Sequence, residues 1–328
     1  MKKLIVGCLA AALALPVAAS AQELTIYSGR GEALVAPIIA QFQRESGIDV
    51  NVRYAGTAEL AALLQEEGEQ SPADVFWAQD GGALGAIAPL FADLPAEVNE
   101  GVAAPFRNVN NKWAPTSGRS RVLLYSTERV EEDALPASVK DLVNEEYRGR
   151  VAWAPTNGSF QAFVTAMRVA EGDEATKEWL EGMIANEAKV YRNNGTQVEA
   201  VANGEVDFGL VNNYYLGRYL ANDEDFPVAQ THFEAGDIGN LLNVAGVGIV
   251  AASDNQENAR TFIDYLLSVP AQQYITLEGN EYPVVPGLIG NVTLEDFDTV
   301  LEISPEIDID QISDLDGTLE LLREVGLL

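Results

Sequence analysis

The chain has 328 residues and a formal net charge of −30, with 50 acidic and 20 basic residues. Nucleic acid is excluded as a partner, because binding to its phosphates needs clustered Lys and Arg side chains. One cysteine, Cys8, and one histidine, His232, leave too few groups for a thiolate zinc site or a Ser-His-Asp triad. A hydrophobic content of 47% supports packed cores, and the length suits about two domains of roughly 100–200 residues each.

Residues 1–21 are predicted to form a secretory signal peptide. Two lysines at positions 2 and 3 precede an apolar run over residues 4–15, and Ala-Ser-Ala at 19–21 is a small-residue cleavage site. The apolar run is shorter than the ~20 residues that a membrane-spanning helix needs. The sequence therefore predicts export to the periplasm. Cleavage after Ala21 would remove Cys8, so we expect a mature chain without disulfides.

The first part of the mature chain alternates between strand and helix patterns. A strand from residue 23 enters the glycine-rich turn 28–32, and apolar residues at helical spacing follow over 35–42. Pro37 favours a helix start close to it. A second strand over 50–54, a helix capped by Thr57 and a third strand over 73–77 complete the pattern. This β-α-β-α-β order predicts a parallel sheet with right-handed crossovers.

A second α/β pattern follows an irregular, Pro-rich stretch over residues 89–115. Strands are expected over 121–125, 151–154, 190–192 and 206–211, with helices between them, and a late strand lies within 241–252. We expect this late strand to return to the first sheet, so that the chain crosses between two lobes near 118–121 and near 236–242. A double crossing forms a hinge beside a cleft. The predicted lobes are 22–119 with 242–295, and 120–241 with 296–328.

The segment from Val206 to Tyr215 is the best candidate for a functional site. An apolar strand ends at Asn212 and Asn213, which favour a turn or a helix cap, and Tyr214 and Tyr215 follow at once. Adjacent side chains converge on one point only where the backbone turns, and ligands usually bind at the carboxyl ends of strands in α/β sheets. Paired phenols suit a hard, highly charged cation such as Fe³⁺. From the pair alone, an aromatic cover over the following helix is the more common interpretation.

Two predicted helix starts carry small polar residues, over 156–159 (Thr-Asn-Gly-Ser) and over 193–196 (Asn-Asn-Gly-Thr). Free N–H groups and the positive end of the helix dipole favour an anion at such a place. Arg119 and Arg121 are candidates to add positive charge. Ordinary helix capping and surface salt bridges are the alternatives for these residues.

Six motifs in order give the chain a resemblance to a known family. They are Tyr27-Ser28-Gly29-Arg30, residues 71–76 (Ser-Pro-Ala-Asp-Val-Phe), residues 117–121 (Ser-Gly-Arg-Ser-Arg), residues 155–158 (Pro-Thr-Asn-Gly), residues 203–207 (Asn-Gly-Glu-Val-Asp) and residues 212–215 (Asn-Asn-Tyr-Tyr). Together they resemble the periplasmic ferric ion-binding proteins of bacterial iron ABC importers. The resemblance extends from about Glu23 to about Gly287.

This resemblance implies an α/β, two-lobed periplasmic binding protein fold, with two mostly parallel sheets joined by a hinge. It implies a transferrin-like clamp on Fe³⁺, with Tyr214 and Tyr215 as phenolate ligands. A synergistic carbonate or phosphate would rest on five polar residues of the second lobe beside Arg119, namely Asn157, Gly158, Ser159, Asn194 and Asn212. The implied partners are an inner-membrane ABC permease and its ATPase, and the implied state is a monomeric, non-enzymatic binding protein.

The chain departs from the family pattern at metal-binding positions. Gly31 stands where some relatives have a histidine, and Gln79 stands where they have a glutamate. A third tyrosine found in other branches is also absent. Water, the anion or Asp80 would then complete the coordination. A binding protein for a small phosphonate or carboxylate is the nearest rival hypothesis. An enzyme is disfavoured, because the sequence has no Gly-x-Ser-x-Gly elbow, no phosphate-loop lysine and no metal-binding histidine pair.

Overall fold

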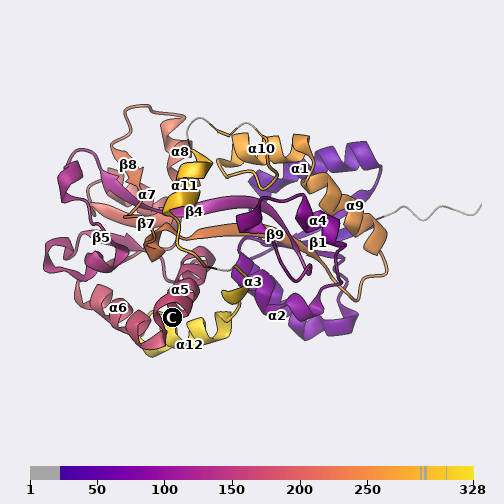
Figure 1. Ribbon diagram of the computed structural model, residues 1–328, viewed down its shortest axis with the longest axis horizontal. Coiled ribbons are helices and arrows are strands. Elements are labelled where there is room, and N and C mark those ends of the chain that lie inside the picture. The colour runs from indigo at the N-terminus through magenta and orange to yellow at the C-terminus, as the bar shows by residue number, and fades with distance from the viewer. Residues whose placement is uncertain (1–22, 289, 292–293, 308) are drawn as a thin grey trace, which may run out of the picture.

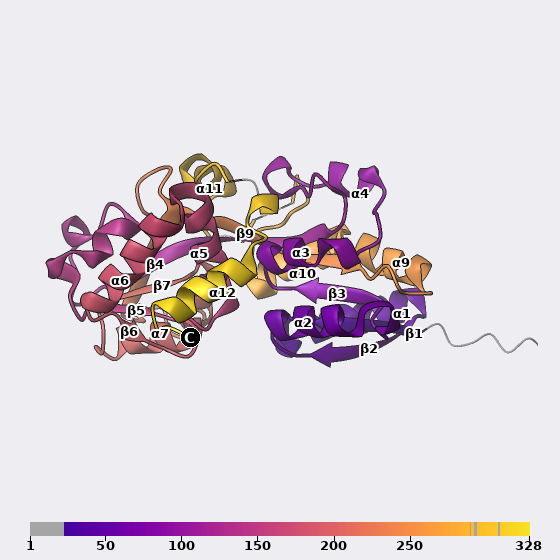
Figure 2. The same ribbon diagram turned by 90° about the horizontal axis from the view of Figure 1, so that it is seen from below.

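The computed structural model describes residues 23–328 except 289, 292–293 and 308. The predicted signal peptide lies outside the described residues. The chain folds into two α/β lobes side by side, and two strands run between them (Figures 1 and 2). The predicted two-lobed α/β architecture is therefore confirmed.

The first lobe takes its elements from the start of the chain and from a later segment. These elements are β1 (Glu23–Ser28), α1 (Glu32–Ser46), β2 (Asp49–Tyr54), α2 (Thr57–Glu67), β3 (Val75–Ala78), α3 (Gly81–Ala86), α4 (Ala96–Glu100), β9 (Leu242–Ile249), α9 (Gln256–Leu266) and α10 (Val269–Gly279). Helix α1 begins at Glu32, which places Pro37 in its second turn, further inside than expected. The buried stripe from Val35 to Phe42 runs past this proline, and its burial maintains the helix.

The second lobe is built from the middle of the chain. Its elements are β4 (Ala114–Ser126), β5 (Val151–Trp153), α5 (Gly158–Glu171), α6 (Asp173–Ala185), β6 (Lys189–Val190), α7 (Asn194–Ala202), β7 (Phe208–Asn212), α8 (Tyr214–Leu220) and β8 (Val228–Thr231). Two further helices, α11 (Phe297–Ile303) and α12 (Leu315–Glu324), follow near the C-terminus.

The strands form one continuous hydrogen-bonded path through both lobes. Its order is β2-β1-β3-β9-β4-β7-β5-β6, with β8 also paired to β4. The outer strands are parallel, as β1 pairs with β2 and β3, and β5 with β6 and β7. The strands near the crossing are antiparallel, because β4 and β9 run in opposite directions between the lobes. The two expected sheets are thus joined, and their centre is antiparallel where the sequence pattern indicated mostly parallel strands.

Strand β4 changes its partners within one residue. Ala114 to Ser120 pair with β9, while Arg121 to Tyr125 pair with β7. A strand of 13 residues is long enough to serve both lobes. We propose that the hinge lies at this change of partner, which agrees with the lobe boundaries expected from the sequence.

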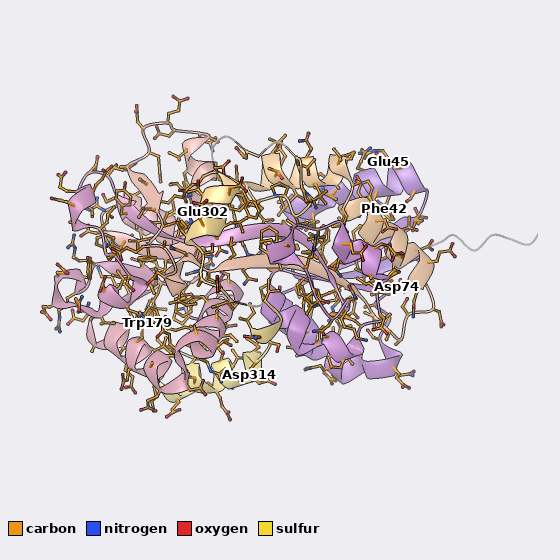
Figure 3. All side chains as sticks on the ribbon, viewed as in Figure 1. Phe42, Glu45, Asp74, Trp179, Glu302 and Asp314 are labelled. Atoms are coloured by element: carbon orange, nitrogen blue, oxygen red, sulfur yellow. The ribbon has the colours of Figure 1, made fainter. Side chains whose placement is uncertain are left out.

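Each lobe has its own aromatic core. In the first lobe, Phe42 of α1 meets Phe262 of α9 edge to face, with ring centroids 5.0 Å apart. In the second lobe, Trp153 of β5 packs against Phe160 of α5 and Trp179 of α6. Figure 3 shows Phe42 and Trp179 in opposite halves of the molecule. Full burial of such a side chain contributes roughly 1.5–3 kcal/mol, and the buried cluster around Trp153 continues to first-lobe residues such as Phe76 and Trp113.

The C-terminal segment contacts both lobes. A short 3-10 helix, Ile309–Gln311, packs on α3, and α12 packs on α5. On α3 the contact is made by glycines, since a Cβ at Gly81 would lie 2.8 Å from Ile309 and one at Gly85 would lie 2.7 Å from Ser313. On α5 it includes a buried hydrogen bond of 2.8 Å between the hydroxyls of Thr165 and Thr318.

Candidate metal centre

Tyr214 and Tyr215 lie together at the junction of β7 and α8. Their hydroxyl oxygens are 3.5 Å apart, and their rings stack with centroids separated by 4.5 Å and planes inclined by 28°. Tyr214 is buried and Tyr215 is half-buried. The backbone changes from strand to helix at this point, so consecutive side chains are not held on opposite faces. Two phenol oxygens can therefore reach the same ion.

Asn213 fixes this junction to the crossing strand. Its N–H donates to the carbonyl of Ser120 at 3.1 Å, and its side-chain oxygen accepts the N–H of Ser120 at 3.1 Å. The sequence offered Asn213 as a helix cap, but its side chain makes no capping hydrogen bond to α8. The tyrosines are instead anchored to the strand that passes between the lobes.

The first lobe reaches the tyrosines through Gln79, which follows β3. The Gln79 amide donates to the Tyr214 hydroxyl at 3.2 Å, and Asn212 donates to the same oxygen at 3.3 Å. Thr57 supports Gln79, because its hydroxyl accepts the Gln79 N–H at 3.2 Å. The expected capping role of Thr57 is wrong: Gly56 is the N-cap of α2, and Thr57 is the first helical residue. Tyr214 thus has donors from both lobes on one oxygen.

The surroundings keep the Tyr215 hydroxyl protonated when no cation is bound. Burial, reinforced by the neighbouring Tyr214, raises the pKa of Tyr215, and bonding from Asn194 and the charge of Arg119 oppose this only in part. A phenol in this state becomes a phenolate when a strong positive charge displaces its proton. Binding of a metal is then coupled to proton release.

Three predicted anion-binding residues meet at the starts of α5 and α7. Asn157 caps α5, and its side-chain oxygen accepts the Ser159 N–H at 3.0 Å and the Ser159 hydroxyl at 2.6 Å. The Asn194 amide, from the first residue of α7, donates to the Ser159 hydroxyl at 3.2 Å. Gly158, the first residue of α5, is exposed between them. We call Asn157, Gly158, Ser159 and Asn194 the helix-start cluster. Its N–H groups and amides suit an oxyanion.

Arg121, the second arginine that the sequence offered for the anion, lies against α5. Its guanidinium carbon is 6.0 Å and 5.3 Å from the ring centroids of Phe160 and Phe163, both on α5, and its Nη1 donates to Asn212 at 3.4 Å. Burial lowers the pKa of Arg121 to about 10, although the tyrosines favour its charged form. Within the part of the chain that the structure describes, its buried Nη2 has no hydrogen-bond partner. An anionic ligand would supply one.

Arg119, which the resemblance placed beside the anion, takes part in a buried ion-pair group with Arg30 and Glu281. Arg30 contacts Glu281 at 2.7 Å and Arg119 contacts it at 3.8 Å, while Arg119 also donates to the Val244 carbonyl at 3.3 Å. Although burial opposes ionisation, Arg30 and then Arg119 hold the pKa of Glu281 below its usual value. Arg30 and Glu281 carried no signal as a pair in the sequence, because 251 positions separate them.

Asp80 faces the helix-start cluster from the first lobe. Its Oδ1 caps α3 by accepting the Ala83 N–H at 2.8 Å. Its Oδ2 is directed across the lobes, since a Cβ built on Gly158 would lie 3.7 Å from it. Asp80 is only 5% exposed, and burial raises its pKa, with partial opposition from the Ala83 N–H and Arg119. The carboxylate therefore lies where the lobes meet.

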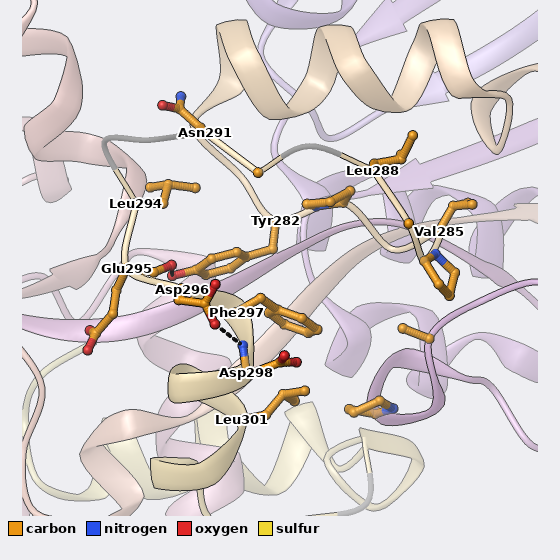
Figure 4. A pocket seen from close by; sticks show the side chains of 16 residues that line it. Tyr282, Val285, Leu288, Asn291, Leu294, Glu295, Asp296, Phe297, Asp298 and Leu301 are labelled. Carbon is orange, nitrogen blue, oxygen red and sulfur yellow. Dashed lines mark hydrogen bonds between the residues drawn. The ribbon is translucent and has the colours of Figure 1, made fainter.

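Other sites are less suited to a metal. Among residues 23–328 outside the gaps, no group of three or more His, Cys, Asp and Glu side chains is arranged to hold one. His232 is bound by Glu295 at 2.7 Å and Ser120 at 3.1 Å, in agreement with a packing role. A pocket of about 610 Å³ lies over Tyr282 and Phe297 and contains none of the predicted site residues (Figure 4).

No helix in the described part of the chain is long and apolar enough to cross a membrane.

Comparisons with known proteins place the chain in a family. Residues 27–273 match the family of bacterial extracellular solute-binding proteins. The chain is 32% identical to the major ferric iron-binding protein of Neisseria meningitidis over 97% of each chain. The structure of iron-bound HitA from Pseudomonas aeruginosa has a TM-score of 0.87 at 32% identity, covering 93% of this chain and 99% of that one. A Trichodesmium protein solved with iron and citrate ligands has a TM-score of 0.79 at 26% identity, covering 93% of this chain and 100% of that one.

The match spans most of the chain, and the two-lobed architecture agrees with it. The chain therefore belongs to the bacterial extracellular solute-binding proteins.

Proposed function

We propose that this protein captures Fe³⁺ between its lobes, together with a small anion, and delivers it to an ABC permease. The observation that carries the proposal is the pair of phenol oxygens 3.5 Å apart, one of which accepts a bond from Gln79 of the opposite lobe. A cation at this point would contact both lobes. Because such an ion binds the closed form better than the open form, it would stabilise closure.

The donor chemistry suits a ferric ion. Phenolate oxygens from Tyr214 and Tyr215 are hard ligands, and ionisation of both phenols offsets part of the charge of a trivalent cation. A carbonate or phosphate on the helix-start cluster, near Asn212 and Arg121, would offset the remainder and fill coordination positions. We propose water, the anion or Asp80 for the remaining positions.

The relatives support the cargo. The named function of the Neisseria relative is ferric iron binding, and the HitA structure is iron-bound. The Trichodesmium structure contains citrate, so the anion of this chain is best determined by direct comparison of carbonate, phosphate and citrate. We propose a periplasmic, monomeric, non-enzymatic carrier whose partners are an inner-membrane permease and its ATPase.

The test is a titration of the iron-free mature protein with ferric citrate, with and without carbonate or phosphate. We expect a visible phenolate-to-iron absorption band that is lost in Tyr214→Phe and in Tyr215→Phe. Tyr219→Phe is the matched control, because Tyr219 lies on the same helix but its hydroxyl bonds to Glu199 at 3.0 Å. Absence of the band under all conditions would show that the cargo is not iron, whereas an unchanged band in both site variants would show that Tyr214 and Tyr215 are not its ligands. Heat released by phosphonates or carboxylates without iron would then favour the rival small-anion carrier.

A further inference from the structure

The carboxylate of Asp80 faces the helix-start cluster across the lobes. Its Oδ1 is occupied by the Ala83 N–H, while its Oδ2 is the atom directed toward Gly158. The N–H groups of Ser159 and Phe160 are bonded to Asn157, so an oxyanion on the first turn of α5 would meet the Gly158 N–H on one side and an acceptor oxygen on the other. Helix α5 has 14 residues, so the donors at its start are backed by a full helix dipole.

A second, independent feature of this place points to an anion. Arg121 is 3% exposed and its Nη2 has no hydrogen-bond partner in the described part of the chain. A buried charged donor without a partner is unfavourable, and an anionic oxygen would satisfy it. The guanidinium lies along α5, beside Phe160 and Phe163, and bonds to Asn212. This place thus has donors from the second lobe and an acceptor from the first.

We propose that Asp80 selects an oxyanion that still carries a proton, such as hydrogen phosphate or bicarbonate, and rejects a fully ionised one such as sulfate. This inference rests on the anion site of the proposed function. The protonated oxygen of the anion donates a hydrogen bond to Oδ2 of Asp80, while its other oxygens accept from α5, Asn194 and Arg121. Sulfate has the same shape but no proton, so it would place two acceptors against each other. A site built to accept a hydrogen bond discriminates strongly against an analogue that lacks the donor.

Calorimetric titration of the iron-free mature protein with inorganic phosphate and with sulfate, slightly above neutral pH, tests the proposal. We expect the wild type to prefer phosphate roughly 100-fold or more, because sulfate leaves Asp80 without a donor. In Asp80→Asn the preference should fall to within roughly tenfold, because an amide can donate to sulfate. Asparagine is as good a helix cap as aspartate, so α3 should remain intact.

Asp296→Asn is the matched control. Asp296 is also an N-cap aspartate, accepting the Asp298 N–H at 3.0 Å, but it lies at the pocket shown in Figure 4 and away from the predicted site residues. This variant should keep the wild-type preference. Equal phosphate-to-sulfate ratios in wild type and Asp80→Asn would overturn the proposal, as would the absence of binding of either anion to the wild type. If iron gives the phenolate band but the protein does not prefer phosphate over sulfate, only the proposed role of Asp80 is wrong. If the protein prefers phosphate but iron gives no band, only the proposed iron cargo is wrong.

Discussion

The two walls of the candidate site are held in place by different forces. The second-lobe wall carries the tyrosines and the helix-start cluster, and neutral amide and hydroxyl groups position it, as in the bonds from Asn194 to Ser159 and between Asn213 and Ser120. From the first lobe, Gln79 and Asp80 are directed toward the site, and Arg30 is close enough to interact electrostatically with both tyrosines. The nearby Arg30–Glu281 pair belongs to a buried ionic group.

This difference indicates a division of roles between the lobes. Neutral hydrogen bonds depend little on pH or salt, so the wall with the proposed metal ligands is expected to keep its shape if the lobes open and close. The opposing wall contributes few contacts, which are easily broken on opening. It also brings the Asp80 carboxylate toward the helix-start cluster, where we propose the anion. Affinity should therefore depend mainly on the second lobe, and selectivity on the first.

The largest effect is expected from the double change Tyr214→Phe with Tyr215→Phe. Loss of both phenol oxygens should weaken ferric binding by at least roughly 100-fold, since even residues that only support metal ligands typically contribute 10–100-fold. Competition with a coloured chelator measures the loss. If the double variant bound iron within tenfold of the wild type, the second-lobe wall would not be the ligand-bearing one.

Glu281→Gln should destabilise the fold rather than the site. Removing the carboxylate leaves Arg30 and Arg119 buried without it, and breaking a buried ion pair typically costs about 3–5 kcal/mol. Urea unfolding of the iron-free protein measures this, with Asp93→Asn as control, because Asp93 pairs with Lys112 but is 82% exposed. The control should lose less than about 1 kcal/mol.

The Glu281 carboxylate should also make the stability of the fold depend on pH in the acid range. The pKa of Glu281 is lower in the folded state than its usual value, so its stabilisation is present above about pH 4.3 and is lost as the pH falls through the folded pKa. Wild-type stability should therefore fall in acid by an increment that Glu281→Gln lacks. Parallel pH profiles of the two proteins would contradict this.

Ferric binding itself should strengthen as the pH rises. Burial raises the pKa of Tyr215, so the phenol is protonated before binding and must release its proton to the solvent. Each phenol that ionises should make the affinity rise roughly tenfold per pH unit below its pKa. Proton release on adding iron, measured in weakly buffered solution, should be smaller by about one proton in Tyr215→Phe than in the wild type.

The smallest effect is expected for Gln79→Leu. The amide donates one hydrogen bond to Tyr214, and such a bond contributes about 1 kcal/mol, or roughly fivefold in affinity. The loss should appear as faster iron release, because the bond joins the lobes. Gln41→Leu, on the exposed face of α1, is the control. A loss as large as that of the tyrosines would mean that Gln79 is itself essential for metal binding.

The sequence was sufficient for the fold and the family, but less so for the site. Periodic apolar residues and six ordered motifs indicated the two lobes and the tyrosine junction, since these are local signals. The roles of the site residues stay predictions. Contacts made through the tertiary fold, such as Arg30 with Glu281 or Gln79 with Tyr214, left no local pattern to read. Thr57 was misassigned for the same reason, because its partner lies 22 positions away.

The C-terminal segment has a mechanical consequence. Its contact with α5 includes specific polar bonds, through Thr318 and through the Asp314 pair with Arg168, whereas its contact with α3 is a close approach of Ile309 and Ser313 to glycines. If the lobes separate, the C-terminal segment should therefore stay bound to α5 and lose its contact with α3. Helix α3 directly follows Asp80, so a force that the C-terminal segment exerts on α3 would act first on the residue for which we propose a contact with the anion.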